Sequence, residues 1–348
     1  MLLVFQPVRH GIAYAAFTPT SELVYDGFLT IDEWSSRHLK QRFDAELLTK
    51  VRGHGRVFTK LGIILPFADI NFRGAKPATS VSLKQLATTS LRQTLLDPAR
   101  LTYEAAKSAW PHLPQFFLSD TYLSDQVDRT FGLPPFSYEM NKTLNSVPYL
   151  VHSYGHRANL ASVKDAKVVL SLYVGEQTSI ALFEDEKLKD ATISHAPFSS
   201  VMGLHSPGSL DVGFVTELVQ KKRPAEVTNL FISQSGLQPM TETKLSIDDL
   251  IHIAGLVPRK DMEHLDKLSI EAIEWIELSV RNFVRSLRHS LGGFLTYSGK
   301  IDSLVINTSV VGATSPLWKL LLSGSLSKLS VHYCDISLLQ AACRDLEA

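Results

Sequence analysis

The stretch Val168–Phe183, VVLSLYVGEQTSIALF, decides the fold class, because two apolar runs flank a short turn at Gly175–Thr178. Two apolar runs separated by a turn predict a β-hairpin. The stretch Leu2–Phe17, LLVFQPVRHGIAYAAF, has the same length and the same plan, with its turn around Pro7–Gly11. A hairpin at the head of each half of the chain is what a duplicated α/β unit would show, although two unrelated hairpins would look similar.

The rest of the chain alternates between helical and strand patterns. Helical periodicity predicts helices at 82–95, 99–110, 211–221 and 269–291, and apolar runs predict strands at 115–119 and 304–306. The helix at 269–291 is expected to end at Gly292–Gly293. The strand at 304–306 opens onto a loop of small residues that includes Gly312, and such loops often bind ligands. An alternating chain of 348 residues predicts two α/β domains, at 1–150 and 151–348.

The composition argues against several classes of function. Thirty-five Lys and Arg balance thirty-five Asp and Glu without a long basic run, so nucleic acid is not expected as a partner. No apolar stretch approaches the roughly 20 residues that span a bilayer, and the apolar start is too short for a signal peptide. These features favour a soluble cytoplasmic protein that does not bind membranes.

Cysteine and histidine spacing does not indicate a metal site. Cys334 and Cys343 lack C-x-x-C spacing, so we expect reduced thiols. His152 and His156 are spaced like a metal pair on a helix, but Gly155 argues for a loop or a helix start. We therefore expect no protein-bound metal at these positions.

Five segments occur in an order that matches one protein family. They are LLDPARLTYEAAKSAWPHLP at Leu95–Pro114, LSDTYL at Leu118–Leu123, HSYGH at His152–His156, VGEQTSI at Val174–Ile180 with MGLHSPGSLD at 202–211, and LVINTSVVGATSP at Leu304–Pro316. They resemble, in the same order, the APLHNPANL, FDTAFH, HGTSH, LGNGSS with MGTRSGD, and TGGIGENSP segments of the acetate kinase (acetokinase) family. The shared order carries the resemblance, which covers nearly the whole chain.

The resemblance implies a fold and a reaction. The fold would be two ribonuclease-H-like α/β domains of the actin, sugar-kinase and acetokinase superfamily, with a central cleft. Residues 1–150 would form the acceptor and phosphate side, and residues 151–348 the nucleotide side. The reaction would transfer a phosphoryl group from ATP to a short-chain carboxylate, giving ADP and an acyl phosphate, with ATP and Mg²⁺ as cofactors. Nucleotide and a small carboxylate would be the partners, and the family implies a homodimer.

The resemblance also implies particular site residues. Asp120 takes the place of the catalytic aspartate, and His152 that of the histidine beside the transferred phosphoryl group. His205 stands where the family has an arginine, and Arg9 lies in the first phosphate loop, so both are candidate charge substitutes. The candidates that would line the nucleotide are Gly175, Ser309 and Gly312.

The positive charge that this chemistry needs is reduced. Phosphoryl transfer requires cations that balance charge on the equatorial oxygens of the transferred group. One family arginine falls near Ile64 in an apolar strand, with Arg73 nearby at best a displaced substitute. The other is His205, which is largely neutral at pH 7 and cannot form the bidentate fork of a guanidinium group. We therefore expect weak or absent transfer.

The phosphate loops depart from the family pattern as well. The first loop, Gln6–Ala13, lacks the early glycine, the serines and the lysine, and Pro7 has no backbone donor. Valines replace glycines in the loop at 309–314, and Asp335 is only a shifted counterpart of a magnesium-linked glutamate. A close phosphate cradle and bound Mg²⁺ are therefore in doubt.

Other interpretations stay open. The chain could be a non-catalytic regulatory or interaction protein of the same fold. It could also be a kinase for a different acceptor, in which Arg9, Arg73 or Arg157 supplies the cations. Asp120 could simply cap the turn after its strand, and His205 could be an ordinary hydrogen-bonded residue.

Overall fold

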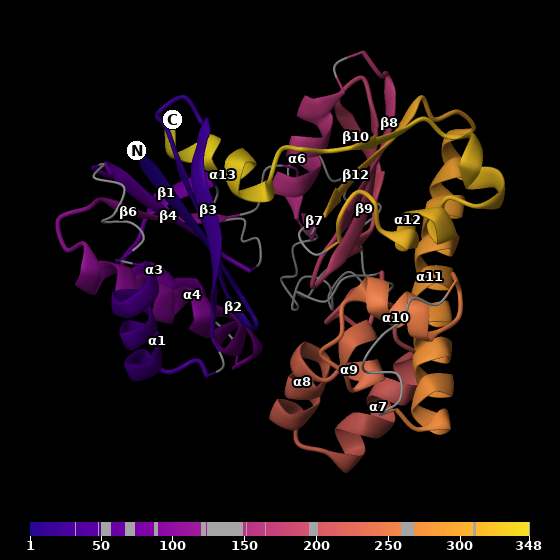
Figure 1. Ribbon diagram of the computed structural model, residues 1–348. Helices are drawn as coiled ribbons and strands as arrows, with labels where there is room; N and C mark the ends of the chain where they lie inside the picture. Colours follow the sequence, from indigo (N-terminus) through magenta and orange to yellow (C-terminus); the bar gives the residue numbers. More distant parts are fainter. Residues whose placement is uncertain are drawn as a thin grey trace, which may run out of the picture. The chain divides into compact units, whose positions relative to one another are not determined.

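The computed structural model (Figure 1) describes residues 1–31, 33–47, 49, 57–66, 74–86, 90–119, 123, 149–150, 152–163, 165–194, 201–258, 268–308 and 311–347. The chain divides into two compact units. Unit 1 comprises residues 1–125, 152–158 and 336–348, and unit 2 comprises residues 126–151 and 159–335. The sequence predicts a boundary between residues 150 and 151. In the structure, residues 152–158 and the C-terminal helix belong to unit 1.

Unit 1 contains a six-stranded sheet in the order β3-β2-β1-β4-β6-β5. Its strands are β1 Leu2–Val8, β2 Gly11–Phe17, β3 Leu23–Thr30, β4 Lys60–Ile64, β5 Gly74–Pro77 and β6 Gln115–Ser119. β1, β2 and β3 are antiparallel, β1, β4 and β6 run parallel, and β5 is antiparallel to β6. The expected N-terminal hairpin and the expected strand at 115–119 are both present.

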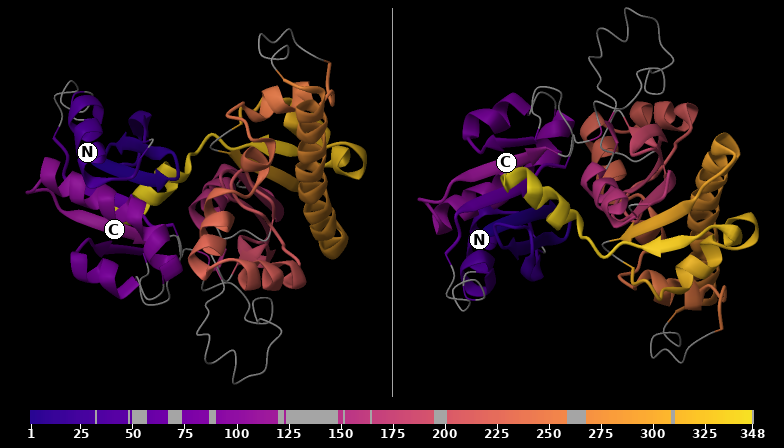
Figure 2. Two further views of the ribbon diagram at one scale, coloured as in Figure 1. Left: turned by 90° about the horizontal axis from the view of Figure 1, so that it is seen from below. Right: turned by 90° about the horizontal axis from the view of Figure 1, so that it is seen from above.

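Helices cover both faces of this sheet. They are α1 Ser36–Arg42, followed by a π-helical turn at Phe43–Leu47, then α3 Ser80–Leu86, α4 Ser90–Ala109 and α13 Leu338–Glu347. In Figures 1 and 2, α1, α3 and α4 lie on one face and α13 on the other. Phe5 of β1 packs against Phe43 and Trp110, with ring centroids 5.6 and 6.5 Å apart. On the α13 face, Leu346 lies over Gly62, where a Cβ would come within 2.8 Å of it. Both faces of the sheet are therefore buried, as in α/β folds.

Unit 2 contains a five-stranded sheet in the order β10-β9-β8-β12-β13. Its strands are β8 Val168–Val174, β9 Thr178–Glu184, β10 Lys187–Ala191, β12 Ser303–Thr308 and β13 Val331–Tyr333, and a separate small sheet pairs β7 Tyr149–Leu150 with β11 Ile193–Ser194. β8, β9 and β10 are antiparallel, whereas β8, β12 and β13 run parallel. This order repeats β3-β2-β1-β4-β6 of unit 1, which favours a duplicated unit over two unrelated hairpins.

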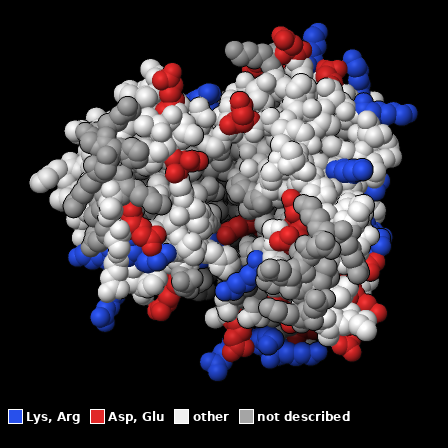
Figure 3. All heavy atoms as spheres, in the orientation of Figure 1, with Lys and Arg blue, Asp and Glu red and all other residues white. Residues whose placement is uncertain are grey.

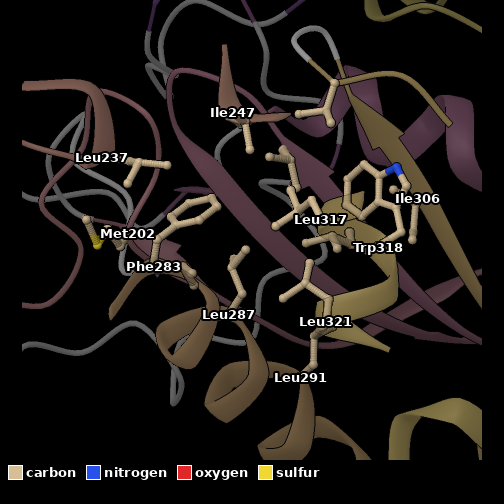
Figure 4. Close-up of a cluster of buried hydrophobic side chains, with 14 of the residues drawn as sticks. Met202, Leu237, Ile247, Phe283, Leu287, Leu291, Ile306, Leu317, Trp318 and Leu321 are labelled. Carbon is tan, nitrogen blue, oxygen red and sulfur yellow. The ribbon is translucent and has the colours of Figure 1, made fainter. Parts of the chain in front are cut away.

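The helices of unit 2 enclose a large apolar core. They are α7 Val212–Lys221, α8 Pro224–Ser233, α9 Leu237–Thr241, α10 Ile247–Ile253, α11 Ile270–Ser298, α12 Pro316–Leu321 and a 3₁₀ turn at Gly324–Lys328, while α6 Ser153–Ser162 begins in unit 1 and ends in unit 2. Figure 4 shows the core side chains of α11 and α12, namely Phe283, Leu287, Leu291, Leu317, Trp318 and Leu321. Each of these buried side chains stabilises the fold by roughly 1.5–3 kcal/mol relative to exposure.

Two predicted helix boundaries are wrong, for related reasons. α11 continues through Gly292–Gly293 and ends at Gly299, whose φ is +69°. Gly in a helix interior costs only about 1 kcal/mol relative to Ala, and continuing the helix buries Phe294. The helices expected at 82–95 and 99–110 are likewise replaced by α3 and by a continuous α4 that contains Pro98. In α11, burial of Phe294 outweighs the cost of Gly292 and Gly293 in the helix.

The described residues on the face in Figure 3 show no single dominant charge. On the face in Figure 3, Lys and Arg side chains are interspersed with Asp and Glu, as a net charge of zero leads one to expect. Within the part of the chain that the structure describes, no helix combines the length and the apolar character needed to cross a membrane.

Candidate functional site

The first part of the candidate site is an edge of the unit 2 sheet. β8 and β12 are parallel neighbours whose last residues, Val174 and Thr308, pair with each other. The residues that follow both strands therefore leave the sheet at one edge, which is where open α/β sheets bind ligands. Gly175 begins the turn after β8, and Gly312 lies in the loop after β12. Ser309, the third nucleotide candidate, lies outside the described residues.

The turn after β8 is packed against the segment that carries His205. The Leu204 N–H donates to Gly175 O at 3.3 Å, and the His205 N–H donates to Glu176 O at 2.8 Å. A Cβ on Gly203 would lie 2.6 Å from the same Glu176 oxygen, so only glycine allows this approach. The structure thus brings Gly175 and His205 together through their backbones, and the His205 side chain is partly exposed beside them.

A buried hydroxyl lies next to His205. Ser206 is 1% exposed, and its Oγ has no hydrogen-bond partner among the described residues. Its carbonyl accepts from the Gly203 N–H at 3.0 Å, which closes the segment into a tight turn. Buried polar groups are normally paired, so an unpaired hydroxyl beside a partly exposed histidine is consistent with a ligand-binding edge.

The described part of the loop after β12, from Val311 onward, is held by protein contacts and exposes Gly312. Gly312 is exposed, and a Cβ built on it would meet only Thr314 Oγ1 at 3.9 Å. Its carbonyl accepts from Trp318 Nε1 at 2.8 Å and from the Ser315 N–H at 3.0 Å. The Ser315 hydroxyl caps α12 by accepting from the Leu317 N–H, and it also contacts a carboxylate oxygen of Asp248 in the first turn of α10.

A cavity of about 440 Å³ adjoins this loop. Its lining includes Thr314, Ser315, Lys319 and the rings of Trp318 and Tyr333, whose centroids are 6.0 Å apart. A volume of this size is within the range of small-molecule sites.

Arg9 lies in a tight turn rather than in an open phosphate loop. Arg9 and His10 connect β1 to β2, and Val8 pairs directly with Gly11. Trp34 Nε1 donates to the Arg9 carbonyl at 2.7 Å. The residues expected to form the first phosphate loop are therefore mostly strand residues.

His152 begins the turn that starts α6. Its φ is +59°, which is uncommon for a residue other than glycine, and its carbonyl accepts from the His156 N–H at 3.1 Å. Burial, together with repulsion from His152, lowers the pKa of the fully buried His156 to about 3. His156 is therefore neutral at pH 7. The expectation that this pair lies at a helix start is confirmed.

Among the remaining candidates, Arg157 is not available as a free cation. Arg157 forms an ion pair with Asp345 at 2.7 Å, so its charge is already balanced. Asp120 and Arg73 lie outside the described residues, although Asp120 directly follows β6. Across the described ranges, no three His, Cys, Asp or Glu side chains are grouped so as to hold a metal ion.

No family model matches the chain. The acetate kinase of Nitratidesulfovibrio vulgaris (strain DSM 19637 / Miyazaki F) is 25% identical over 226 residues, which are 62% of this chain and 52% of that protein. The chain thus spans about half the length of the curated relatives it matches.

Solved structures match over a larger share of the chain. A propionate kinase from Francisella tularensis subsp. tularensis SCHU S4 superposes with a TM-score of 0.74 at 16% identity, covering 99% of this chain and 98% of that one. An acetate kinase from Porphyromonas gingivalis gives a TM-score of 0.71 at 14% identity with the same coverage. The expected two-domain, ribonuclease-H-like α/β fold is therefore confirmed.

The chain is therefore similar in sequence to acetate kinases and shares its fold with solved acetate and propionate kinases.

Proposed function

We propose that the protein binds ATP at the β8 and β12 edge of unit 2 and transfers its terminal phosphoryl group to a short-chain carboxylate only slowly. The observation that carries this proposal is the pairing of Thr308 with Val174, which sets the turn at Gly175 and the loop at Gly312 at one edge of the sheet. The open space at Gly312 and the adjoining cavity support a nucleotide there.

The residues present fit a nucleotide better than they fit a magnesium ion. Thr314, Lys319 and the exposed ring of Tyr333 line the cavity beside the loop, and an aromatic face suits a purine base. No carboxylate cluster for a metal occurs in the described ranges. Mg²⁺ would arrive with the nucleotide, as it usually does in phosphotransferases, and would neutralise phosphate charge.

We propose slow phosphoryl transfer because the candidate site carries less positive charge than the family's site. In this proposal Asp120 and His152 retain the family's roles at the reacting group, and Arg9 and His205 are the charge substitutes. A histidine has an ordinary pKa of about 6.5 and gives less positive charge at pH 7 than arginine. Removal of one preorganised donor commonly lowers a rate by roughly 10²–10³. Losses within one site are not additive, so measurable activity can survive.

A gain-of-function variant tests this account. Restoring the family's charge with His205→Arg should raise the rate of acyl phosphate formation by about tenfold or more, since one such donor is worth at least that. The assay is hydroxylamine trapping of the acyl phosphate formed from Mg·ATP and acetate, propionate or butyrate. Asp120→Asn should abolish the signal.

The matched control is His289→Arg, which adds the same charge on an exposed turn of α11. If the two arginine variants have equal rates, loss of the arginine at position 205 does not limit transfer.

A non-catalytic role is the second candidate, and one observation favours it. A tight turn at Arg9 stands where the family resemblance implies an open phosphate loop. In that case the protein does not turn over ATP, whether or not it binds it, and His205→Arg yields no acyl phosphate. The chain then acts through other proteins. A second copy of the chain is the partner that the family resemblance suggests, and the mass in solution would test it.

A further inference from the structure

One contact joins the start of α6 to the end of β6 and to the C-terminal helix, all within unit 1. Tyr154 is fully buried two residues after His152. Its hydroxyl lies 2.7 Å from Asp345 Oδ2 and 3.3 Å from the carbonyl oxygen of Ser119. Ser119 is the last residue of β6 and directly precedes Asp120. Tyr154, which follows His152 by two residues, therefore contacts the residue that directly precedes Asp120.

Asp345 is held from two positions of the same helix. Tyr154 donates to its Oδ2, and Arg157 Nη1 donates to its Oδ1 at 2.7 Å. Residues three apart lie on one face of a helix, so both donors reach the carboxylate together. The side chains of Arg157 and Asp345 are only 21% and 22% exposed, which makes this pair less screened than a surface ion pair. Charge-assisted hydrogen bonds of this length are stronger than neutral ones.

The turn that this network holds is conformationally demanding. A histidine at φ +59° occupies a region that L-residues rarely adopt, so its neighbours must hold it there. His156, four residues after His152, is fully buried and neutral at pH 7. A phenol with one proton can satisfy one acceptor fully, and the shorter contact is to Asp345. Asp345 thus anchors the phenol that lies against the end of β6.

We propose that Asp345, acting through Tyr154 and Arg157, is a positioning residue that orients His152 toward the end of β6 for phosphoryl transfer. The effect of Asp345 on the rate of phosphoryl transfer rests on the proposed function. Its effect on the orientation of the His152 ring does not. Groups that orient catalytic or ligating residues typically change activity by about 10- to 100-fold when removed.

The test compares two mild variants with a control on the same helix. Tyr154→Phe removes only the hydroxyl, and Asp345→Asn keeps the shape and removes the charge. Glu347→Gln is the control, because Glu347 contacts the Ser21 hydroxyl and not α6. Thermal unfolding followed by circular dichroism checks that each variant folds, and Tyr154→Phe serves if Asp345→Asn does not fold.

Two readouts separate this proposal from the proposed function. The first is the split between kcat and KM: we expect kcat to fall by about 10- to 100-fold in Tyr154→Phe and Asp345→Asn, with the KM for ATP within about twofold. The second is the imidazole C–H signal of His152 in NMR spectra, assigned with His152→Gln, which should move in both variants and not in Glu347→Gln.

If the wild type turns over and the variants keep its kcat, the positioning role is refuted and the proposed function stands. If the wild type shows no turnover, the proposed function fails, and the NMR signal alone decides. A shifted His152 signal then supports the positioning role, and an unchanged signal overturns it.

Discussion

Gly203→Ala tests the packing that brings Gly175 and His205 together. An alanine Cβ at this position would lie 2.6 Å from Glu176 O and 2.9 Å from Gln177 Cα. Both are backbone atoms, so no side-chain rotation relieves the overlap. Inserting a methyl group into a packed site costs about 1–3 kcal/mol, and we expect the free energy of unfolding to fall by that amount. The affinity for Mg·ATP should fall as well, because the turn after β8 must move.

The matched control is the same substitution in open space. Gly293 lies inside α11, is exposed, and has no atom within 4 Å of a built Cβ. Alanine is favoured over glycine in a helix interior by about 0.5–1 kcal/mol, so Gly293→Ala should stabilise unit 2. Urea unfolding followed by circular dichroism measures both variants. The reasoning is refuted if Gly203→Ala is as stable as the wild type, or if the two variants shift stability in the same direction.

The remaining predictions concern acid stability and the loop after β12. His156 has a pKa lowered to about 3, so the folded state resists a proton that the unfolded chain accepts below about pH 6.5. The contribution of His156 to the free energy of unfolding should be fully present above pH 6.5. It should then fall toward pH 3 by up to about 1.4 kcal/mol per pH unit. In urea unfolding, His156→Gln should reduce this pH dependence between pH 7 and 5. A slope that stays the same would contradict the burial of a neutral histidine. Ser315→Ala removes the cap of α12 and its contact with Asp248, so it should lower the free energy of unfolding by about 1 kcal/mol and weaken Mg·ATP binding measured by calorimetry. Unchanged stability and affinity would show that this contact does not hold the loop.

Local patterns were sufficient to predict part of each sheet. The hairpins at Leu2–Phe17 and Val168–Phe183 are recognisable because apolar runs and turn residues are close in sequence. The strand at 304–306 and the long helix that precedes it follow from the same kind of pattern. Hairpin pairing is a local property, and local properties can be inferred from one sequence.

Helix ends and unit membership were harder to predict, because distant contacts decide them. No residue close in sequence to Gly292–Gly293 indicates that α11 continues past them and buries Phe294. Likewise, the C-terminal helix joins unit 1 through Leu346, which packs over Gly62 far away in sequence. Such contacts exist only after the chain has folded.

The candidate site residues stay predictions. The motif order singled out Gly175 and His205, and in the structure the Gly175–Glu176 turn accepts hydrogen bonds from the backbone of Leu204 and His205. The motif order did not reveal the contacts of Asp345, because the family pattern predicts a magnesium-linked glutamate in the C-terminal segment. Arg157 was considered as a free cation, and only the folded structure pairs it with Asp345.

The most direct test of the central claim is titration of the purified protein with Mg·ATP by calorimetry, beside a thermal-shift assay. The account predicts saturable binding with a Kd below about 1 mM, which corresponds to roughly −4 kcal/mol or better. It also predicts a raised unfolding temperature, since a ligand that binds only the folded state stabilises it. No heat and no shift at millimolar Mg·ATP would contradict nucleotide binding at the β8 and β12 edge.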